Sequence, residues 1–466
     1  MITRTTNDPF VILQFTNTLL KMALITPVMF TISLVMILKT SLSLSLVLAV
    51  VIPIIILGVI LIAKTSEPLS EKLQKRLDKL NRISRENLTG IRVIRAFGNE
   101  KYEEKRFDET NESYAEVAKK LNKLMAISQP LFFFLLNIAI IVIFWISSKM
   151  INVGTLQVGQ LVAFIEYLFH AMFSIMLFSM VFVMYPKAQV SANRIMEVLN
   201  TEPIIKSPKN GIKDTENKGT IEFENVSFTY PNGEEPVIKD VSFNGKKGEV
   251  IAFIGSTGSG KSTLINLIPR FYDVTKGSIK IDGVDVRDYD LKYLRKKIGF
   301  IPQKTLLFTG SIANNIKFGK KDAEYKEVED SAKIAQAYEF ISNKPNKFDE
   351  IITEGGSNVS GGQKQRLSIA RAIVRKPDIY IFDDSFSALD FKTDAILRKE
   401  LRAETKDAIV LIVAQRIGSI MDADKIIVLN EGEVVGIGTH KELIKTCSIY
   451  HEIATSQLTE EELANE

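Results

Sequence analysis

The chain has 466 residues, of which 46% are hydrophobic, and it carries a formal net charge of +4 at pH 7 and a single cysteine, Cys447. This length accommodates about two or three domains, and one cysteine excludes a disulfide framework. The small net charge, without a basic stripe, argues against the nucleic-acid-binding class, so we expect no nucleic-acid partner.

Four apolar stretches lie within the first 190 residues, and each is long enough to cross a membrane as a helix. They cover residues 15–38, 42–63, 126–148 and 158–185. Buried helices of a large soluble core are the alternative, but four such stretches in so short a segment favour membrane helices. The polar N-terminus lacks the pattern of a secretory signal peptide. We therefore predict a multi-pass protein of the cytoplasmic (inner) membrane, in contact with membrane lipid.

The segment 64–123, between the second and third stretches, is long and highly charged. The excess of lysine and arginine around it and at Lys187 predicts that these helix ends lie in the cytoplasm. Because Gly90 and Gly98 are almost its only turn residues, the segment predicts two membrane helices that continue into the cytoplasm for about 25 residues each, roughly 40 Å. A turn near 98–100 would join them. A coiled-coil spacer is the alternative interpretation.

A change of composition marks the boundary of a second domain. Residues 191–219 are predicted to be a linker, because they combine Pro203, Pro208 and an Asn-Gly pair with mixed charge. The pattern of a soluble α/β domain follows at 220–458, and a short acidic tail is predicted at 459–466.

The second domain contains several strand-like patterns. Residues 221–230 alternate between apolar and polar, as in a half-buried strand. Residues 248–254 form a predicted buried strand, and 378–384 and 408–414 are near-continuous apolar runs, typical of parallel strands covered on both faces. Residues 426–438 are predicted to form a hairpin around an Asn-Glu-Gly turn.

The sequence GSTGSGKS at 255–262 fits the phosphate-binding loop G-x-x-x-x-G-K-[ST], between a predicted strand and a predicted helix at 262–271. Its glycines let backbone N–H groups turn around phosphate oxygens. Lys261 can reach the β- and γ-phosphates, and the Ser262 hydroxyl can ligate Mg²⁺. The predicted nucleotide-binding residues of this segment are Gly255, Ser256, Thr257, Gly258, Ser259, Gly260, Lys261, Ser262 and Thr263.

Further motifs suit the same chemistry. In VSGGQKQR, a serine hydroxyl, glycine N–H groups and a helix N-terminus are suited to a γ-phosphate, although a plain helix cap is the alternative. The residues predicted to bind there are Ser360, Gly361, Gly362 and Gln363. Asp383 ends the apolar run IYIFDD, where a carboxylate can hold Mg²⁺. Gln303 offers an amide to the metal or to an attacking water, and the Tyr230 ring can stack on adenine.

With these motifs together, the chain resembles an ATP-binding cassette (ABC) exporter half-transporter over essentially its whole length. The resemblance implies an α-helical transmembrane domain at 1–190, with four of the usual six helices, followed by an α/β P-loop ABC nucleotide-binding domain. It implies ATP and Mg²⁺ as cofactors. By resemblance, Tyr230 is the adenine-stacking aromatic, 255–262 the Walker A loop, Gln303 the Q-loop and Asp383 the Walker B aspartate, with VSGGQ the signature motif.

Two positions depart from the family pattern. The family's catalytic base is a glutamate, but here it is Asp384, whose carboxylate is drawn back by one methylene, roughly 1.5 Å. The family's switch histidine is Gln415, which can donate a hydrogen bond but cannot carry positive charge. Together they resemble the degenerate-site subunit of a heterodimeric exporter. In this family two cassettes sandwich two ATP molecules, so the intact signature would complete a competent site with a partner half-transporter's Walker motifs.

Other interpretations remain open at this stage. A homodimeric exporter with a slow Asp384 site is one, and a soluble ABC ATPase outside transport is another. The residues leave the transported substrate open. The segment RTTND at 4–8 resembles one that follows the second membrane helix in this family, so the resemblance leads us to expect that this sequence lacks the first two helices.

Overall fold

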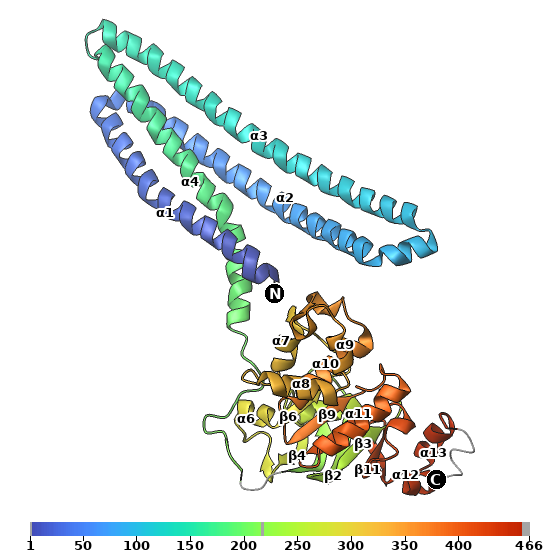
Figure 1. Ribbon diagram of the computed structural model, residues 1–466. Helices are drawn as coiled ribbons and strands as arrows, with labels where there is room; N and C mark the ends of the chain where they lie inside the picture. The colour runs from blue at the N-terminus through green and yellow to red at the C-terminus, as the bar shows by residue number, and fades with distance from the viewer. Residues whose placement is uncertain (1, 216–218, 459–466) are drawn as a thin grey trace. The chain divides into compact units, whose positions relative to one another are not determined.

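The computed structural model describes residues 2–215 and 219–458 of the chain. The predicted acidic tail at 459–466 and positions 216–218 of the predicted linker lie outside the described residues. The chain forms two compact units, Met1–Glu202 and Pro203–Glu466 (Figure 1).

The first unit consists of long helices, each with an apolar segment long enough to cross a membrane. They are α1 (Ile2–Thr40), α2 (Leu42–Phe97), α3 (Glu100–Asn152) and α4 (Val158–Leu199). Within the unit, α1 packs along α4 and α2 along α3 (Figure 1). Many large apolar side chains, such as Leu24 and Ile141, are exposed on the outside of these helices, as expected where lipid is the solvent. The four predicted membrane helices are thus confirmed.

The charged segment between the second and third spans is helical on both sides of a single tight turn. Gly98 caps the end of α2 in the left-handed conformation, with φ 64°, and Asn99 caps the start of α3. An ion pair of 2.7 Å joins Arg106 of α3 to Glu86 of α2, so the two charged extensions run side by side. The turn lies where the sequence predicts it, because glycine adopts this backbone conformation without a steric penalty.

The second unit is built on a six-stranded sheet in the order β12-β11-β3-β10-β9-β6. All neighbouring strands are parallel except β12, which pairs antiparallel with β11. The strands are β3 (Val250–Ile254), β6 (Ile298–Ile301), β9 (Ile379–Asp383), β10 (Ile409–Val413), β11 (Lys425–Asn430) and β12 (Glu433–Gly438). Alternate residues of one strand enter different cores: Ile251 and Phe253 lie in one, Ala252 and Ile254 in the other. The sheet is therefore covered on both faces, as the apolar runs predict.

A smaller antiparallel sheet in the order β2-β1-β4-β5 covers one core. Its strands are β1 (Thr220–Phe228), β2 (Ile238–Lys246), β4 (Lys276–Ile281) and β5 (Val284–Asp285), and a separate pair is β7 (Gly310–Ser311) with β8 (Ile351–Ile352). The helices are α5 (Lys261–Leu267), α6 (Leu291–Lys296), α7 (Ile312–Lys317), α8 (Tyr325–Ile334), α9 (Tyr338–Ser342), α10 (Gly361–Ile373), α11 (Phe391–Glu404), α12 (His440–Thr446) and α13 (Ser448–Thr455). Short 3₁₀ turns in the described residues are η1 (Lys347–Asp349), η2 (Glu354–Gly356) and η3 (Ile417–Ser419).

Helix α5 is shorter than the predicted helix at 262–271, since it ends at Leu267. Pro269 has no backbone N–H to continue the helical hydrogen bonds, and Arg270 has a left-handed φ of 53°. The predicted linker 191–219 also differs in its first residues, which continue α4 to Leu199.

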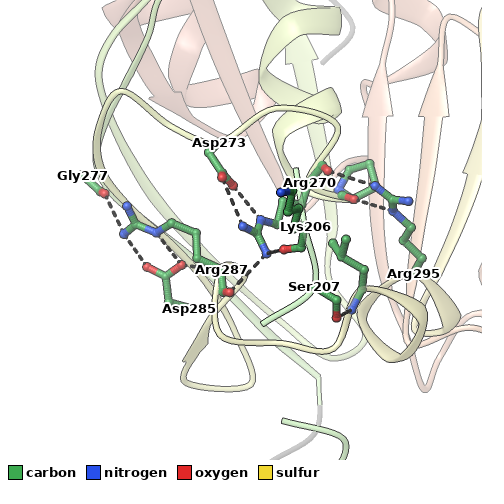
Figure 2. A network of polar contacts seen from close by, with 10 residues as sticks. Lys206, Ser207, Arg270, Asp273, Gly277, Asp285, Arg287 and Arg295 are labelled. Carbon is green, nitrogen blue, oxygen red and sulfur yellow. Dashed lines mark hydrogen bonds and ion pairs between the residues drawn. The ribbon is translucent and has the colours of Figure 1, made fainter. Parts of the chain in front are cut away.

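Residues 203–215, which we call the linker strap, begin the second unit and are tied to the rest of it (Figure 2). The guanidinium of Arg270 donates to the Lys206 carbonyl at 3.3 Å, to the Arg287 carbonyl at 3.1 Å and to both carboxylate oxygens of Asp273. The Ser207 hydroxyl accepts from the Leu291 backbone N–H at 3.1 Å. Arg270 is 7% exposed, so it is a buried charge held by a carboxylate and two carbonyls.

Replacing Arg270 by alanine should release the linker strap. The change leaves two carbonyls without their donor and removes a buried ion pair, at a cost of about 2–4 kcal/mol. Tryptic cleavage at Lys206, Lys209 or Lys213 of the detergent-solubilised chain should become at least about 30-fold faster, because cleavage follows the population of the open strap. The control is Arg287→Ala, which removes a partly exposed pair with Asp285 and should change cleavage by a few-fold at most. Equal cleavage of the two variants would contradict this role for Arg270.

Candidate nucleotide-binding site

Four parallel strands end at one edge of the large sheet and bring the predicted site residues together. The phosphate loop follows β3, Asp383 is the last residue of β9, Gln415 comes shortly after β10, and Gln303 follows β6. Val413 of β10 lies beside Asp383 of β9 and Phe253 of β3. The carboxyl ends of parallel strands are where open α/β sheets bind their ligands.

The phosphate loop depends on its glycines for shape. Gly258 and Gly260 have left-handed φ values of 88° and 96°, which side chains with a Cβ rarely adopt. A Cβ on Gly255 would collide with the Leu429 carbonyl, and one on Gly260 would collide with the Ile238 side chain. The backbone can therefore turn closely around a bound anion only with glycine at these positions.

Lys261 lies folded into the loop. Its ammonium group donates to the carbonyl oxygens of Gly255 at 2.8 Å and Ser256 at 2.9 Å. Burial lowers the pKa of Lys261, and the nearby carboxylates of Asp384 and Asp383 oppose that shift. A buried ammonium group gains from an anionic neighbour, so this side chain is placed to favour a polyphosphate beside the loop.

Two of the three predicted magnesium ligands, Ser262 and Asp383, are adjacent. The Ser262 hydroxyl donates to Oδ1 of Asp383 at 2.8 Å. Asp383 is 7% exposed, and burial raises its pKa, while the Ser262 hydrogen bond opposes the shift. A hydroxyl and a carboxylate side by side suit Mg²⁺, which is commonly bound by one or two protein oxygens with substrate phosphates and waters. No group of three His, Cys, Asp or Glu side chains forms a metal site among the described residues.

Asp384 is the centre of a second cluster. Its Oδ2 accepts hydrogen bonds from the side-chain amides of Gln415 at 2.9 Å and Gln303 at 3.3 Å. Burial raises the pKa of Asp384, and the Gln303 hydrogen bond opposes that shift. The structure therefore brings together the three residues predicted to be catalytic, and both amides act on the same carboxylate oxygen.

Tyr230 lies next to the phosphate-loop helix α5. Its hydroxyl is 3.0 Å from the Thr263 hydroxyl, which connects two of the predicted nucleotide-binding residues. Its half-buried ring meets the rings of Tyr272 and Phe228 edge-on, with centroids 5.2 and 4.9 Å away. These contacts fix the ring beside the loop.

The signature residues form the N-terminus of α10. The Gln363 backbone N–H donates to the Ser360 hydroxyl at 3.3 Å, and the Ser360 N–H donates to the Gln363 side chain at 3.1 Å. This is a capping box. A Cβ on Gly361 would meet open space, whereas one on Gly362 would approach the Ala388 carbonyl. Hydrogen bonds found for Ser360 and Gln363 in the described part of the chain stay within α10, and none joins them to the phosphate loop.

One contact near this site, made by Gln457, could not be predicted from the sequence patterns. The side chain of Gln457, just after α13, hydrogen-bonds to the backbone on both sides of Arg416. Glutamine at the end of an amphipathic helix is ordinarily a solvated residue, and nothing in the local pattern connects it to Gln415, 42 residues earlier.

Known families and proteins match nearly the whole chain. The ABC transporter transmembrane region family matches residues 1–184, and the ABC transporter family matches residues 238–387. An uncharacterized ABC transporter ATP-binding protein of Mycobacterium tuberculosis is 36% identical over 464 residues, covering 98% of this chain and 79% of that protein. A protein of Bacillus subtilis with the same description is 39% identical over 460 residues, covering 99% and 80%.

A putative multidrug export ATP-binding/permease protein of Bacillus subtilis is 36% identical over 372 residues, covering 80% of this chain and 64% of that protein. The structure of a bacterial Atm1-family ABC exporter with ATP bound superimposes with a TM-score of 0.84 and 27% identity, covering 98% of this chain and 81% of that one. The predicted fold class and the multi-pass location in the inner membrane are confirmed. The chain therefore belongs to the ABC transporter family and is an exporter half-transporter, with a transmembrane region and an ATP-binding domain on one polypeptide.

Proposed function

We propose that this chain is one half of a heterodimeric exporter, and that its own Walker site binds MgATP but hydrolyses it slowly. The observation that carries the proposal is the cluster at Asp384. Its carboxylate is one methylene shorter than the family's glutamate, and two neutral amides, from Gln303 and Gln415, hold its Oδ2. Names of relatives that refer to multidrug export support a role in moving small molecules out of the cell.

Binding would use the phosphate loop. Backbone N–H groups of the loop and the Lys261 ammonium group would hold the β- and γ-phosphates, with the Tyr230 ring against adenine. Ser262, Asp383 and the Gln303 amide would hold Mg²⁺, which supplies neutralisation of phosphate charge when bound. All of these side chains are positioned by strand ends or by α5, so we propose that binding is intact.

Hydrolysis would be impaired for two separate reasons. Asp384 would accept a proton from the attacking water, and a base must lie within hydrogen-bond reach of that proton. A displacement of about 1 Å can lower a rate by about a hundredfold. Gln415 can donate to a γ-phosphate but brings no positive charge to the developing negative charge.

The intact signature at Ser360, Gly361 and Gly362 would act in the other site. An exposed helix N-terminus favours an anion, and these residues make no hydrogen bond to this chain's own phosphate loop in the described residues. We propose that they complete a competent site with the Walker motifs of a second half-transporter. The proposed domain organisation is a membrane domain at 1–190, which includes the cytoplasmic segment 64–123, and a cassette at 220–458.

The proposal predicts an asymmetric response to mutation. Ser360→Arg should reduce steady-state ATP hydrolysis by the heterodimer about a hundredfold or more, since it places a bulky cation where the partner's γ-phosphate would bind. Asp384→Asn should lower the same rate by less than about threefold, because this site contributes little turnover. Asn343→Arg, which adds the same charge at an exposed position on the same unit, is the matched control. Equal losses for the first two variants would favour a homodimer with two equivalent sites.

A further inference from the structure

Gln457 contacts the backbone of the loop that carries Gln415 at two points. Its Nε2 donates to the Gln415 carbonyl at 2.9 Å, and its Oε1 accepts from the Ile417 N–H at 2.9 Å. The two backbone partners fix the orientation of the amide, because a carbonyl only accepts and an N–H only donates. Both polar ends of the side chain are therefore used on one short segment of backbone.

The element that carries Gln457 is anchored in a core. Tyr450 of α13 is fully buried, and its hydroxyl lies 2.6 Å from Nδ1 of the buried His440 at the start of α12. Ala454, one turn before Gln457, is also fully buried. A Cβ on Gly436 of β12 would press on Leu443 and Cys447, so these helices pack closely against the sheet. Gln457 therefore follows a helix that is firmly packed against the sheet.

The loop leads directly to the Asp384 cluster. Gln415 uses its carbonyl for Gln457 and its side-chain amide for Oδ2 of Asp384. The side chains of Gln415 and Arg416 are exposed, whereas Ile417 is fully buried. Between the end of β10 at Val413 and the buried Ile417, Gln457 supplies a hydrogen-bond anchor from outside the loop.

We propose that Gln457 is a positioning residue, which fixes the backbone at Gln415 so that the Gln415 amide stays directed at Asp384 and at the γ-phosphate of bound nucleotide. This inference rests on the proposed role of Gln415 as the γ-phosphate donor. It makes the C-terminal helix pair α12–α13 part of the machinery that retains nucleotide at this site. Loss of Gln457 would then loosen the loop that carries Gln415 and speed nucleotide release, although Gln457 itself would not contact the nucleotide.

The test measures release of a non-hydrolysable ATP analogue, with Mg²⁺, from the chain reconstituted in lipid nanodiscs. Gln457→Leu should speed release about 3- to 10-fold, the effect of losing one or two such hydrogen bonds. Gln457→Glu keeps an acceptor for the Ile417 N–H but places a carboxylate against the Gln415 carbonyl, so its effect should match or exceed that of Gln457→Leu. Ser456→Ala is the matched control, because the Ser456 hydroxyl donates to the Ile453 carbonyl of α13 at 2.7 Å and not to the loop at Gln415 in the described residues.

A double-mutant cycle separates positioning from general stability. In a Gln415→Ala background, Gln457→Leu should change the release rate by less than about 1.5-fold, because the group being positioned is gone. An equal acceleration in both backgrounds, or none in the unmodified background, would overturn the inference. The assay involves no hydrolysis, so fast turnover at the Asp384 site would refute the proposed degenerate site and leave the result of this cycle unaffected.

Discussion

Lys261→Ala is expected to abolish or greatly weaken ATP binding to this chain. The ammonium group is buried in the phosphate loop, within hydrogen-bond distance of the Gly255 and Ser256 carbonyls. Its charge-assisted bonds to phosphate would be worth about 2–4 kcal/mol, which corresponds to a weakening of about 30- to 700-fold. Photolabelling of the chain in membranes by a photoreactive ATP analogue measures this directly.

The matched control for that experiment is Lys280→Ala. Lys280 belongs to the same unit and forms a surface ion pair of 2.7 Å with Glu224, so its loss should cost at most about 1 kcal/mol and leave labelling intact. Unchanged labelling of Lys261→Ala at low analogue concentration would show that the loop is not the phosphate site.

The large-scale organisation could be predicted from sequence because its determinants are local. Apolar length predicts each membrane helix, and the glycine at position 98 predicts the turn between α2 and α3. The glycine-rich loop, the apolar runs before Asp383 and Gln415, and the hairpin of β11 and β12 are each contained in a few consecutive residues. Such local patterns can be recognised without knowledge of the tertiary structure.

The contacts between these elements could not be predicted in the same way. That Gln303 and Gln415 share one oxygen of Asp384 depends on the order β10-β9-β6 in the sheet, which no local pattern contains. The burial of Arg270 against the linker strap is also tertiary, because Lys206 lies 64 residues earlier in the chain. Helix α5 ends early for a local reason, the proline at 269. The sequence-based prediction of a longer helix gave more weight to the apolar periodicity of 262–271 than to this proline.

The second large effect is a gain of activity. Asp384→Glu combined with Gln415→His is expected to raise hydrolysis at this site by about 10- to 100-fold. The glutamate restores the reach of the carboxylate, and the histidine restores a group that can carry positive charge near pH 7. The phosphate loop and the Ser262–Asp383 pair are unchanged in this variant, so MgATP affinity should stay within a few-fold of the original.

The two single variants should each give part of that gain. In Asp384→Glu alone, the Gln415 amide would still hydrogen-bond to the new carboxylate. In Gln415→His alone, the histidine would still face the shorter aspartate. The gain in hydrolysis rate of the double variant should therefore exceed the sum of the gains of the two single variants. A double variant no faster than the unmodified chain, facing a sound signature, would place the cause of slow hydrolysis elsewhere.

Single-turnover hydrolysis of ATP at the Asp384 site is the most direct test of the proposed degenerate site. The experiment uses the assembled heterodimer, with the partner's catalytic glutamate replaced so that only the site formed by Lys261, Asp383 and Asp384 can act. We predict that the unmodified chain retains bound MgATP in this heterodimer. It should hydrolyse that ATP at least about a hundredfold more slowly than the partner's site does in a heterodimer whose partner glutamate is intact. Hydrolysis at the Asp384 site as fast as at the partner's glutamate site would contradict the proposed degenerate site.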